Sequence, residues 1–114
     1  SLFESWLVSV LCAYRSYRNL FDDWNYWAPT ENSRFEVDLL LWRGKECLAI
    51  EIKSSKKYRS EFSKGLRALN ENWRGRKPIR NIIVYLGAEP LKTPEGFEVL
   101  PLALFLNQIE QGQL

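Results

Sequence analysis

The chain has 114 residues, 46% of them hydrophobic, and a formal net charge of +2, which predicts one globular domain over residues 1–114 and excludes a disordered chain. It contains no histidine, so a Ser-His-Asp triad, a histidine-ligated metal and a histidine general base are excluded, and the two cysteines, Cys12 and Cys47, cannot complete a four-ligand zinc site alone. Because no signal peptide is visible and no apolar run approaches the roughly 18–20 residues of a membrane span, we expect a cytoplasmic protein with no membrane partner.

Helices and strands are predicted to alternate along the chain. Apolar residues recur at helical spacing over 2–18, which predicts a helix with Glu4 on the edge of its apolar stripe. A second helix is predicted over 60–73, with Ser60 as its N-cap, and a loop over 87–96. The other predicted elements are five strands and a last helix, in chain order: 24–27, 35–42, 47–53, 79–86, 97–100 and 101–111.

The two best strands, 35–42 and 47–53, flank a short turn and carry charged residues among aliphatic ones. Gly44-Lys45 is suited to a two-residue hairpin turn in which glycine comes first. Pairing Arg43 with Glu46 across this turn fixes the register of the hairpin. In that register Asp38 lies directly opposite Glu51.

The same register separates two faces of the hairpin, because side chains alternate along each strand. One face is wholly aliphatic and is predicted to pack on a core: Val37, Leu39, Leu41, Leu48, Ile50 and Ile52. The other face is apolar near the turn and charged at the far end: Leu40, Trp42, Cys47, Ala49, then Glu36, Asp38, Glu51 and Lys53.

The opposed carboxylates of Asp38 and Glu51 predict a site for a divalent cation. Directly opposed residues have Cβ atoms roughly 4.5–5.5 Å apart, where two carboxylates repel and attract a cation. Oxygen ligands without histidine suit Mg²⁺ or Mn²⁺. Lys53 shares the face of Glu51 and is placed to stabilise negative charge, with Glu36 as its cross-strand neighbour. The alternative is a surface hairpin with an exposed polar end and ordinary Glu–Lys pairs.

Positive charge is concentrated between Lys53 and Arg80. This stretch has ten basic residues and two acids, a balance of +8, whereas the rest has six basic and twelve acidic residues, a balance of −6. Either it is a solvated helix face with basic loops, or it binds phosphates beside the acidic site. The candidate nucleic-acid-binding residues are Lys56, Lys57, Arg59, Lys64, Arg67, Arg74, Arg76 and Lys77. Tyr58, Trp73 and Trp27 are candidates for base stacking, although a core position is favoured for Trp73.

The order of these elements and charges resembles a known superfamily. A helix with Glu4, a strand with Val37-Asp38 and a strand with Glu51-Ile52-Lys53, followed by a helix and a strand, is similar to the core of PD-(D/E)xK nuclease-like proteins. More narrowly, five blocks resemble the domain of unknown function found C-terminal to the ATPase domain of many bacterial and archaeal AAA-type ATPases: LFESWLVSVL, YWAPTENSRFEVDLLL, CLAIEIKSS, SKGLRALNENW and FEVLPLALFL.

The resemblance implies a restriction-endonuclease-like α/β fold, with a central mixed sheet flanked by helices. It implies Asp38 and Glu51 as ligands of Mg²⁺ or Mn²⁺, Lys53 as the catalytic lysine and Glu4 as an auxiliary acid. Val37 stands where the superfamily motif has proline. The resemblance also implies that this domain is the C-terminal part of a longer ATPase protein.

Two functions follow as expectations. The first is metal-dependent hydrolysis of DNA phosphodiester bonds, in which Asp38, Glu51, Lys53 and Glu4 act on a strand bound by the basic stretch. The second is a catalytically inactive module that binds nucleic acid or a partner protein for an attached ATPase. A homodimer formed through an exposed apolar face is compatible with both.

Overall fold

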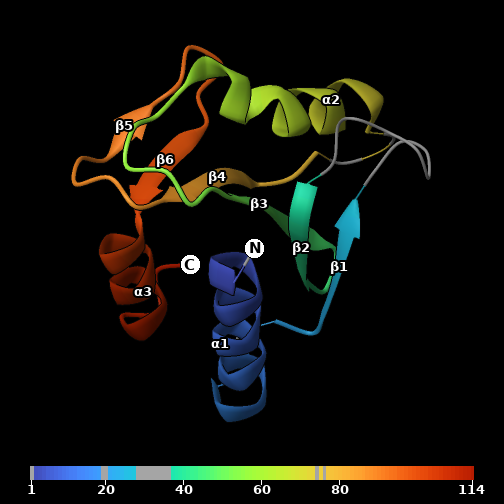
Figure 1. Cartoon of the computed structure of the whole chain (residues 1–114). Helices are drawn as coiled ribbons and strands as arrows, with labels where there is room; N and C mark the ends of the chain where they lie inside the picture. Colours follow the sequence, from blue (N-terminus) through green and yellow to red (C-terminus); the bar gives the residue numbers. More distant parts are fainter. Residues whose placement is uncertain (1, 19–20, 28–36, 74, 76) are drawn as a thin grey trace.

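The computed structural model describes the backbone of residues 2–18, 21–27, 37–73, 75 and 77–114, and the side chains of these residues except 14–18, 26–27 and 37–38. None of the helices in this part of the chain combines the length and the apolarity needed to cross a lipid bilayer. The elements follow one another as shown in Figure 1: α1 (Leu2–Arg18), β1 (Asp23–Trp27), β2 (Val37–Arg43), β3 (Glu46–Ile52), η1 (Ser60–Ser63, a 3₁₀ helix), α2 (Lys64–Asn72), β4 (Arg80–Tyr85), β5 (Leu91–Lys92), β6 (Glu98–Pro101) and α3 (Leu102–Glu110).

The described strands form one six-stranded sheet in the order β1-β2-β3-β4-β6-β5. β3, β4 and β6 run parallel to one another, whereas β1, β2 and β5 pair antiparallel with their neighbours. α2 covers one face of the sheet, and α1 and α3 cover the other (Figure 1). The predicted α/β class, with a mixed sheet flanked by helices, is therefore confirmed.

The turn between β2 and β3 sets the register that the sequence predicts. Gly44 opens this turn at φ 60°, a left-handed backbone conformation that glycine adopts without steric cost. Arg43 pairs with Glu46 across the turn, and the ladder extends to Leu39 opposite Ile50. Each residue of β3 is thereby assigned to one face of the sheet.

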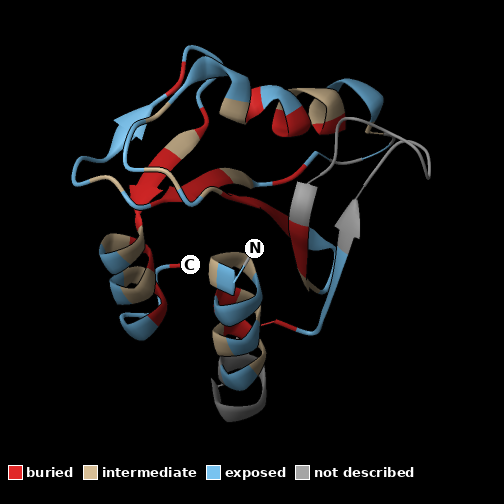
Figure 2. Ribbon diagram, in the orientation of Figure 1, coloured by how far each residue is buried: buried red, intermediate tan, exposed pale blue. Residues whose placement is uncertain are grey.

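Most described residues of β2 and β3 are buried (Figure 2), and the two faces of the hairpin belong to separate cores. The predicted aliphatic face packs against α1 and α3, and contributes Leu39, Leu41, Leu48, Ile50 and Ile52 to the first core. The opposite face packs against α2, and the second core contains Leu40, Cys47 and Ala49 with Leu66 and Leu69 of the helix. β3 therefore runs through the interior of the protein, which excludes a surface hairpin.

Two predicted elements differ from those observed by more than a shift of their ends. The helix predicted over 60–73 begins as the 3₁₀ turn η1, and Ser60 lies inside that turn instead of capping a helix. Ser63 precedes α2 without a side-chain capping bond, because its hydroxyl donates to the Ser60 carbonyl oxygen at 2.8 Å. The loop predicted over 87–96 contains β5, whose two residues are too few to show a strand pattern in the sequence.

A close backbone approach follows β4. Tyr85 is 3% exposed, and its hydroxyl donates to the carbonyl oxygen of Glu89 at 2.5 Å. A methyl group added to Gly87 would lie 2.3 Å from the Tyr85 ring. Glycine is therefore needed at position 87 because the buried ring of Tyr85 occupies the space of a side chain.

Gly87→Ala is expected to destabilise the protein by about 1–3 kcal/mol, the usual cost of overpacking a filled site. The measurement is urea unfolding followed by circular dichroism. The control is the same change in a Tyr85→Leu background, where the ring has been removed and the cost of the added methyl group should shrink. An equal cost in both backgrounds would show that the ring is not the obstacle.

Candidate functional site

Glu51 is a buried acid within an otherwise apolar strand. Its side chain is 4% exposed, and strand alternation puts it on the side of Cys47 and Ala49, which face α2. On the neighbouring parallel strand its partner is Ile83, also buried. Buried carboxylates in proteins are paired, hydrogen-bonded or bound to a metal, because an uncompensated charge is costly there. This burial distinguishes Glu51 from an ordinary surface acid.

Asp38 belongs to the backbone of β2, one residue before the last described pair of the β2–β3 ladder, Leu39 with Ile50. One further step of that register would set its Cα opposite the Cα of Glu51. The Asp38 side chain and the whole of Glu36 lie outside the described residues. Among the side chains that are described, no group of three or more His, Cys, Asp or Glu residues is placed to hold a metal. The pairing of Asp38 with Glu51 stays a prediction.

Lys53 follows β3 and continues its ladder, since its N–H donates to the Val84 carbonyl oxygen at 2.9 Å. Its ammonium nitrogen lies over the ring of Phe62, 5.6 Å from the ring centroid. Tyr58 meets the same ring edge-on, with centroids 5.9 Å apart. Phe62 falls within the helix predicted over 60–73, and no role at the site is predicted for it from the sequence. The contact with Lys53 could have been inferred from the crossover between β3 and β4. In such a crossover the start of the helical segment packs over the end of the preceding strand, which brings Phe62 near Lys53.

The loop after β3 is tied to the end of β4. The N–H of Leu86 donates to the Ser55 carbonyl oxygen at 2.9 Å. The Ser55 hydroxyl donates to the Lys57 carbonyl oxygen and accepts from the Lys57 N–H, at 2.9 and 3.2 Å. The carboxyl ends of the two parallel strands therefore lie together, and this is the edge of an open α/β sheet where ligands most often bind.

Glu4 lies on α1, one turn before Leu7. Leu7 belongs to the core that includes Ile50 and Ile52, so α1 covers the face opposite α2. Glu51 and Lys53 share the α2 face, whereas the predicted auxiliary acid Glu4 approaches the sheet from the other side.

The candidate basic residues are divided between two ends of the sheet. Four follow the carboxyl end of β3: Lys56, Lys57, Arg59 and Lys64. Lys77 lies at the opposite end, just before Ile79, whose N–H donates to the Cys47 carbonyl oxygen at 2.9 Å. Arg74 and Arg76 lie outside the described residues. Among the described residues, the basic side chains therefore lie at two ends of the parallel strands, because α2 carries the chain from the end of β3 back toward the start of β4.

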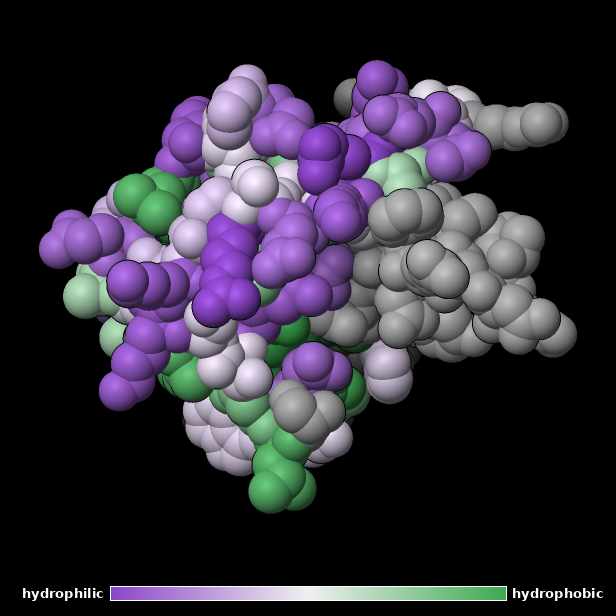
Figure 3. Space-filling view, turned by 45° about the horizontal axis from the view of Figure 1, so that its top comes forward, coloured by the Kyte–Doolittle hydropathy of each residue, from purple (hydrophilic) through white to green (hydrophobic). Residues whose placement is uncertain are grey.

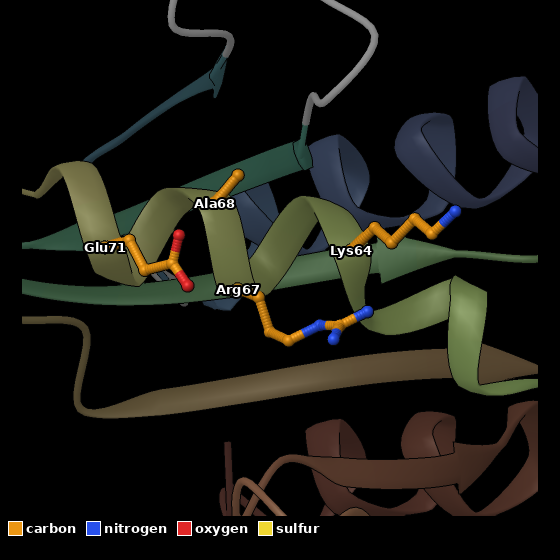
Figure 4. A pocket seen from close by; sticks show the side chains of 4 residues that line it. All are labelled: Lys64, Arg67, Ala68 and Glu71. Carbon is orange, nitrogen blue, oxygen red and sulfur yellow. The ribbon is translucent and has the colours of Figure 1, made fainter.

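Arg67, another candidate, projects from the outer face of α2 toward the turn between β5 and β6. Its Nε is 3.3 Å from a carboxylate oxygen of Glu95, close enough for an ion pair but without hydrogen-bond geometry. A hydrogen bond from its own backbone N–H, one from Thr93 and the charge of Arg67 lower the pKa of Glu95. A shallow hollow on this helix face is lined by Lys64, Arg67, Ala68 and Glu71 (Figure 4). The described surface seen in Figure 3 is largely hydrophilic.

Arg80, at the end of the basic stretch, has a structural role. Its Nε and Nη2 donate to the two carboxylate oxygens of Glu98 at 2.8 and 2.7 Å, and Nη1 donates to the Gln113 carbonyl oxygen at 2.9 Å. The hydrogen bonds to Glu98 raise the pKa of Arg80 further above its usual value. Its charge is thus used to join β4, β6 and the segment after α3.

Two of the aromatic candidates for base stacking, Trp73 and Tyr58, contribute to packing. Trp73 is partly buried against the second core, and its ring stacks on Trp42 at 5.9 Å between centroids. This agrees with the core position favoured for Trp73. Tyr58 packs against the same core, and the side chain of Trp27 lies outside the described residues.

Cysteine chemistry is not available at Cys47. Its side chain is buried in the second core, and that burial raises the pKa of the thiol to about 11. The reactive thiolate is therefore scarce at neutral pH. The described side-chain groups at the end of β3 that could take part in a reaction are the carboxylate of Glu51 and the ammonium of Lys53.

Comparison with known proteins places the chain in a family. No curated protein and no solved structure gives a significant match. The model of one family, Domain of unknown function (DUF4143), matches residues 1–105, a span that includes α1, all the described strands and the candidate site. The chain therefore belongs to this family of domains, DUF4143.

Proposed function

We propose that this domain is a metal-dependent nuclease that hydrolyses DNA phosphodiester bonds at the carboxyl end of β3. The observation that carries the proposal is the burial of Glu51 in an aliphatic strand, with Lys53 on the same face of that strand. An ionisable group held in the interior beside an oppositely charged one is a frequent property of catalytic sites. In this proposal the fold is of the restriction-endonuclease type.

The donors at this position suit a hard divalent cation. Glu51 offers carboxylate oxygens from a rigid strand, and the β2–β3 register would bring Asp38 opposite it. Oxygen ligands in a chain without histidine suit a hard ion such as Mg²⁺ or Mn²⁺. When bound, such an ion would polarise a phosphate and lower the pKa of a water molecule.

Lys53 supplies positive charge beside these carboxylates. A protonated amine has no lone pair, so Lys53 is not itself a metal ligand. Its role is to stabilise the negative charge that develops on the phosphate oxygens in the transition state. Glu4 is proposed as an auxiliary acid, although it lies on α1, across the sheet from α2.

The loop after β3 and the start of α2 would bind the DNA backbone. Lys56, Lys57 and Lys64 are exposed, and within the described part of the chain none of them forms an ion pair. Arg59 is also exposed, and its pair with Glu61 at 3.8 Å is long and solvated, so it competes weakly with a phosphate. Lysine contacts to phosphate carry no sequence information, which favours binding without base specificity.

A second candidate is a module that binds nucleic acid or protein without cleaving. The position of Glu4 favours it, because Glu4 lies on α1, which covers the face of the sheet opposite the α2 face that carries Glu51. In both proposals the domain serves an ATPase in the same chain, as the resemblance to ATPase-linked domains implies. Absence of cleavage of single-stranded, duplex and branched DNA with Mg²⁺ or Mn²⁺, together with retained DNA binding, would favour this module.

Asp38→Asn combined with Glu51→Gln is expected to abolish high-affinity Mn²⁺ binding, because both replacements remove the charge and keep the shape. Isothermal titration calorimetry measures the affinity, and circular dichroism checks that the fold persists. Glu61→Gln, which neutralises an exposed acid in η1, is the control and should bind like the parent. Unchanged Mn²⁺ affinity in the double variant would contradict the proposed metal site.

Lys53→Ala is expected to lower single-turnover cleavage by roughly 10²–10³-fold, as for other preorganised electrostatic groups, while Mn²⁺ affinity stays equal or rises slightly. The removal of a nearby positive charge explains the second effect. Cleavage by this variant at the parental rate would remove Lys53 from the mechanism.

Lys57→Glu is expected to weaken binding to duplex DNA and to reduce the salt dependence by about 0.9 log units per log unit of salt for each phosphate that is no longer neutralised. The matched control is Lys77→Glu, which makes the same charge change at the opposite end of the sheet and should have a smaller effect. Fluorescence anisotropy at several salt concentrations gives both slopes. A larger effect of Lys77→Glu would move the DNA-binding surface to the other end.

A further inference from the structure

The ammonium of Lys53 lies over the aromatic ring of Phe62. Its Nζ lies 5.6 Å from the centroid of Phe62. Tyr58 packs edge-on against Phe62 at an interplanar angle of 88°, and both rings are packed against the second core. The ring beneath the ammonium is thus held in place by its neighbours.

A lysine side chain has four rotatable bonds, so its ammonium samples many positions unless something holds it. The face of an aromatic ring is negative, and it attracts a cation placed over it. Within the described part of the chain, no acid forms an ion pair with Lys53. Glu36, the acid predicted to lie opposite it, is outside those residues. The described contact that fixes the amine is therefore with Phe62.

We propose that Phe62 is a positioning residue for Lys53, holding its ammonium on the face of β3 that carries Glu51. This inference rests on the proposed nuclease function. A carboxylate in the same role would neutralise the amine and compete with a phosphate for it. The ring attracts the ammonium without cancelling its charge, so the N–H groups that point away from the ring remain available to a phosphate oxygen.

The place of Phe62 in the chain explains how this contact forms. β3 ends at Ile52, and the chain turns back through the loop that Ser55 ties to β4. The 3₁₀ turn η1 then places Phe62 above the end of the strand, before α2 continues across the sheet. Phe62 thus packs on the second core and contacts Lys53 at the same time.

The first test measures the contact without reference to activity. In the parent protein, the ring current of Phe62 should shift the NMR signals of the Lys53 Cε protons upfield from those of Lys56 and Lys57. Phe62→Leu should abolish this shift, and Phe62→Tyr, which keeps a ring, should retain most of it. Phe97→Leu is the matched control, because it makes the same change at a buried position of the same core. An unchanged Lys53 signal in Phe62→Leu would overturn the proposal.

The second test connects the contact to catalysis. Phe62→Leu should lower the single-turnover cleavage rate roughly two- to fivefold, the decrease expected when one solvent-accessible cation–π interaction is removed. Mn²⁺ affinity should not change, Phe62→Tyr should restore the rate, and Phe97→Leu should cleave like the parent.

In a Lys53→Ala background, Phe62→Leu should have no further effect on cleavage. An equal decrease in both backgrounds would show that Phe62 acts through packing alone and would overturn its positioning role. Absence of cleavage in the parent protein is a different result. It would reject the nuclease function, and the catalytic meaning of the contact with it, while the NMR signals would still decide whether Phe62 holds Lys53.

Discussion

The register of the β2–β3 hairpin is the constraint on which the rest of the structure depends. The turn at Gly44 sets it, and each strand residue is then committed to one of two cores. A slip of one residue would exchange the faces, moving Ile50 and Ile52 toward α2 and Glu51 into the wholly apolar core beneath α1. Burying a carboxylate there would be costly. The packing of the two cores and the position of Glu51 therefore favour the same β2–β3 register.

The topology of the sheet, more than the composition of the chain, determines which basic residues can bind a ligand. Basic residues that are close in the sequence lie at opposite ends of the parallel strands, because α2 carries the chain from the end of β3 back to the start of β4. Arg80 and Arg67 are each engaged by an acid from the β5–β6 region, Glu98 and Glu95. Some of the basic residues that are concentrated in this stretch of the sequence are therefore paired with acids within the fold, and others are available to a ligand.

Much of the fold could be predicted from the sequence, because the hairpin has a two-residue turn and strict alternation, and α1 has a clear helical period. The burial of Glu51 could not, since it depends on α2 covering a face that carries charge at one end. The contact between Phe62 and Lys53 joins residues of different elements, and no local pattern indicates it. The position of the Asp38 side chain remains a prediction, because only its backbone in β2 is described.

The two edge strands of the sheet, β1 and β5, differ in length. β5 has two residues, Leu91 and Lys92, and follows Pro90, which has no N–H to donate. Short strands, lysine and proline are features by which proteins protect a sheet edge from pairing with another chain. β1 has five residues at the opposite edge. Growth of this sheet by addition of an outside strand is therefore disfavoured beside β5, and the longer template for such a strand is β1.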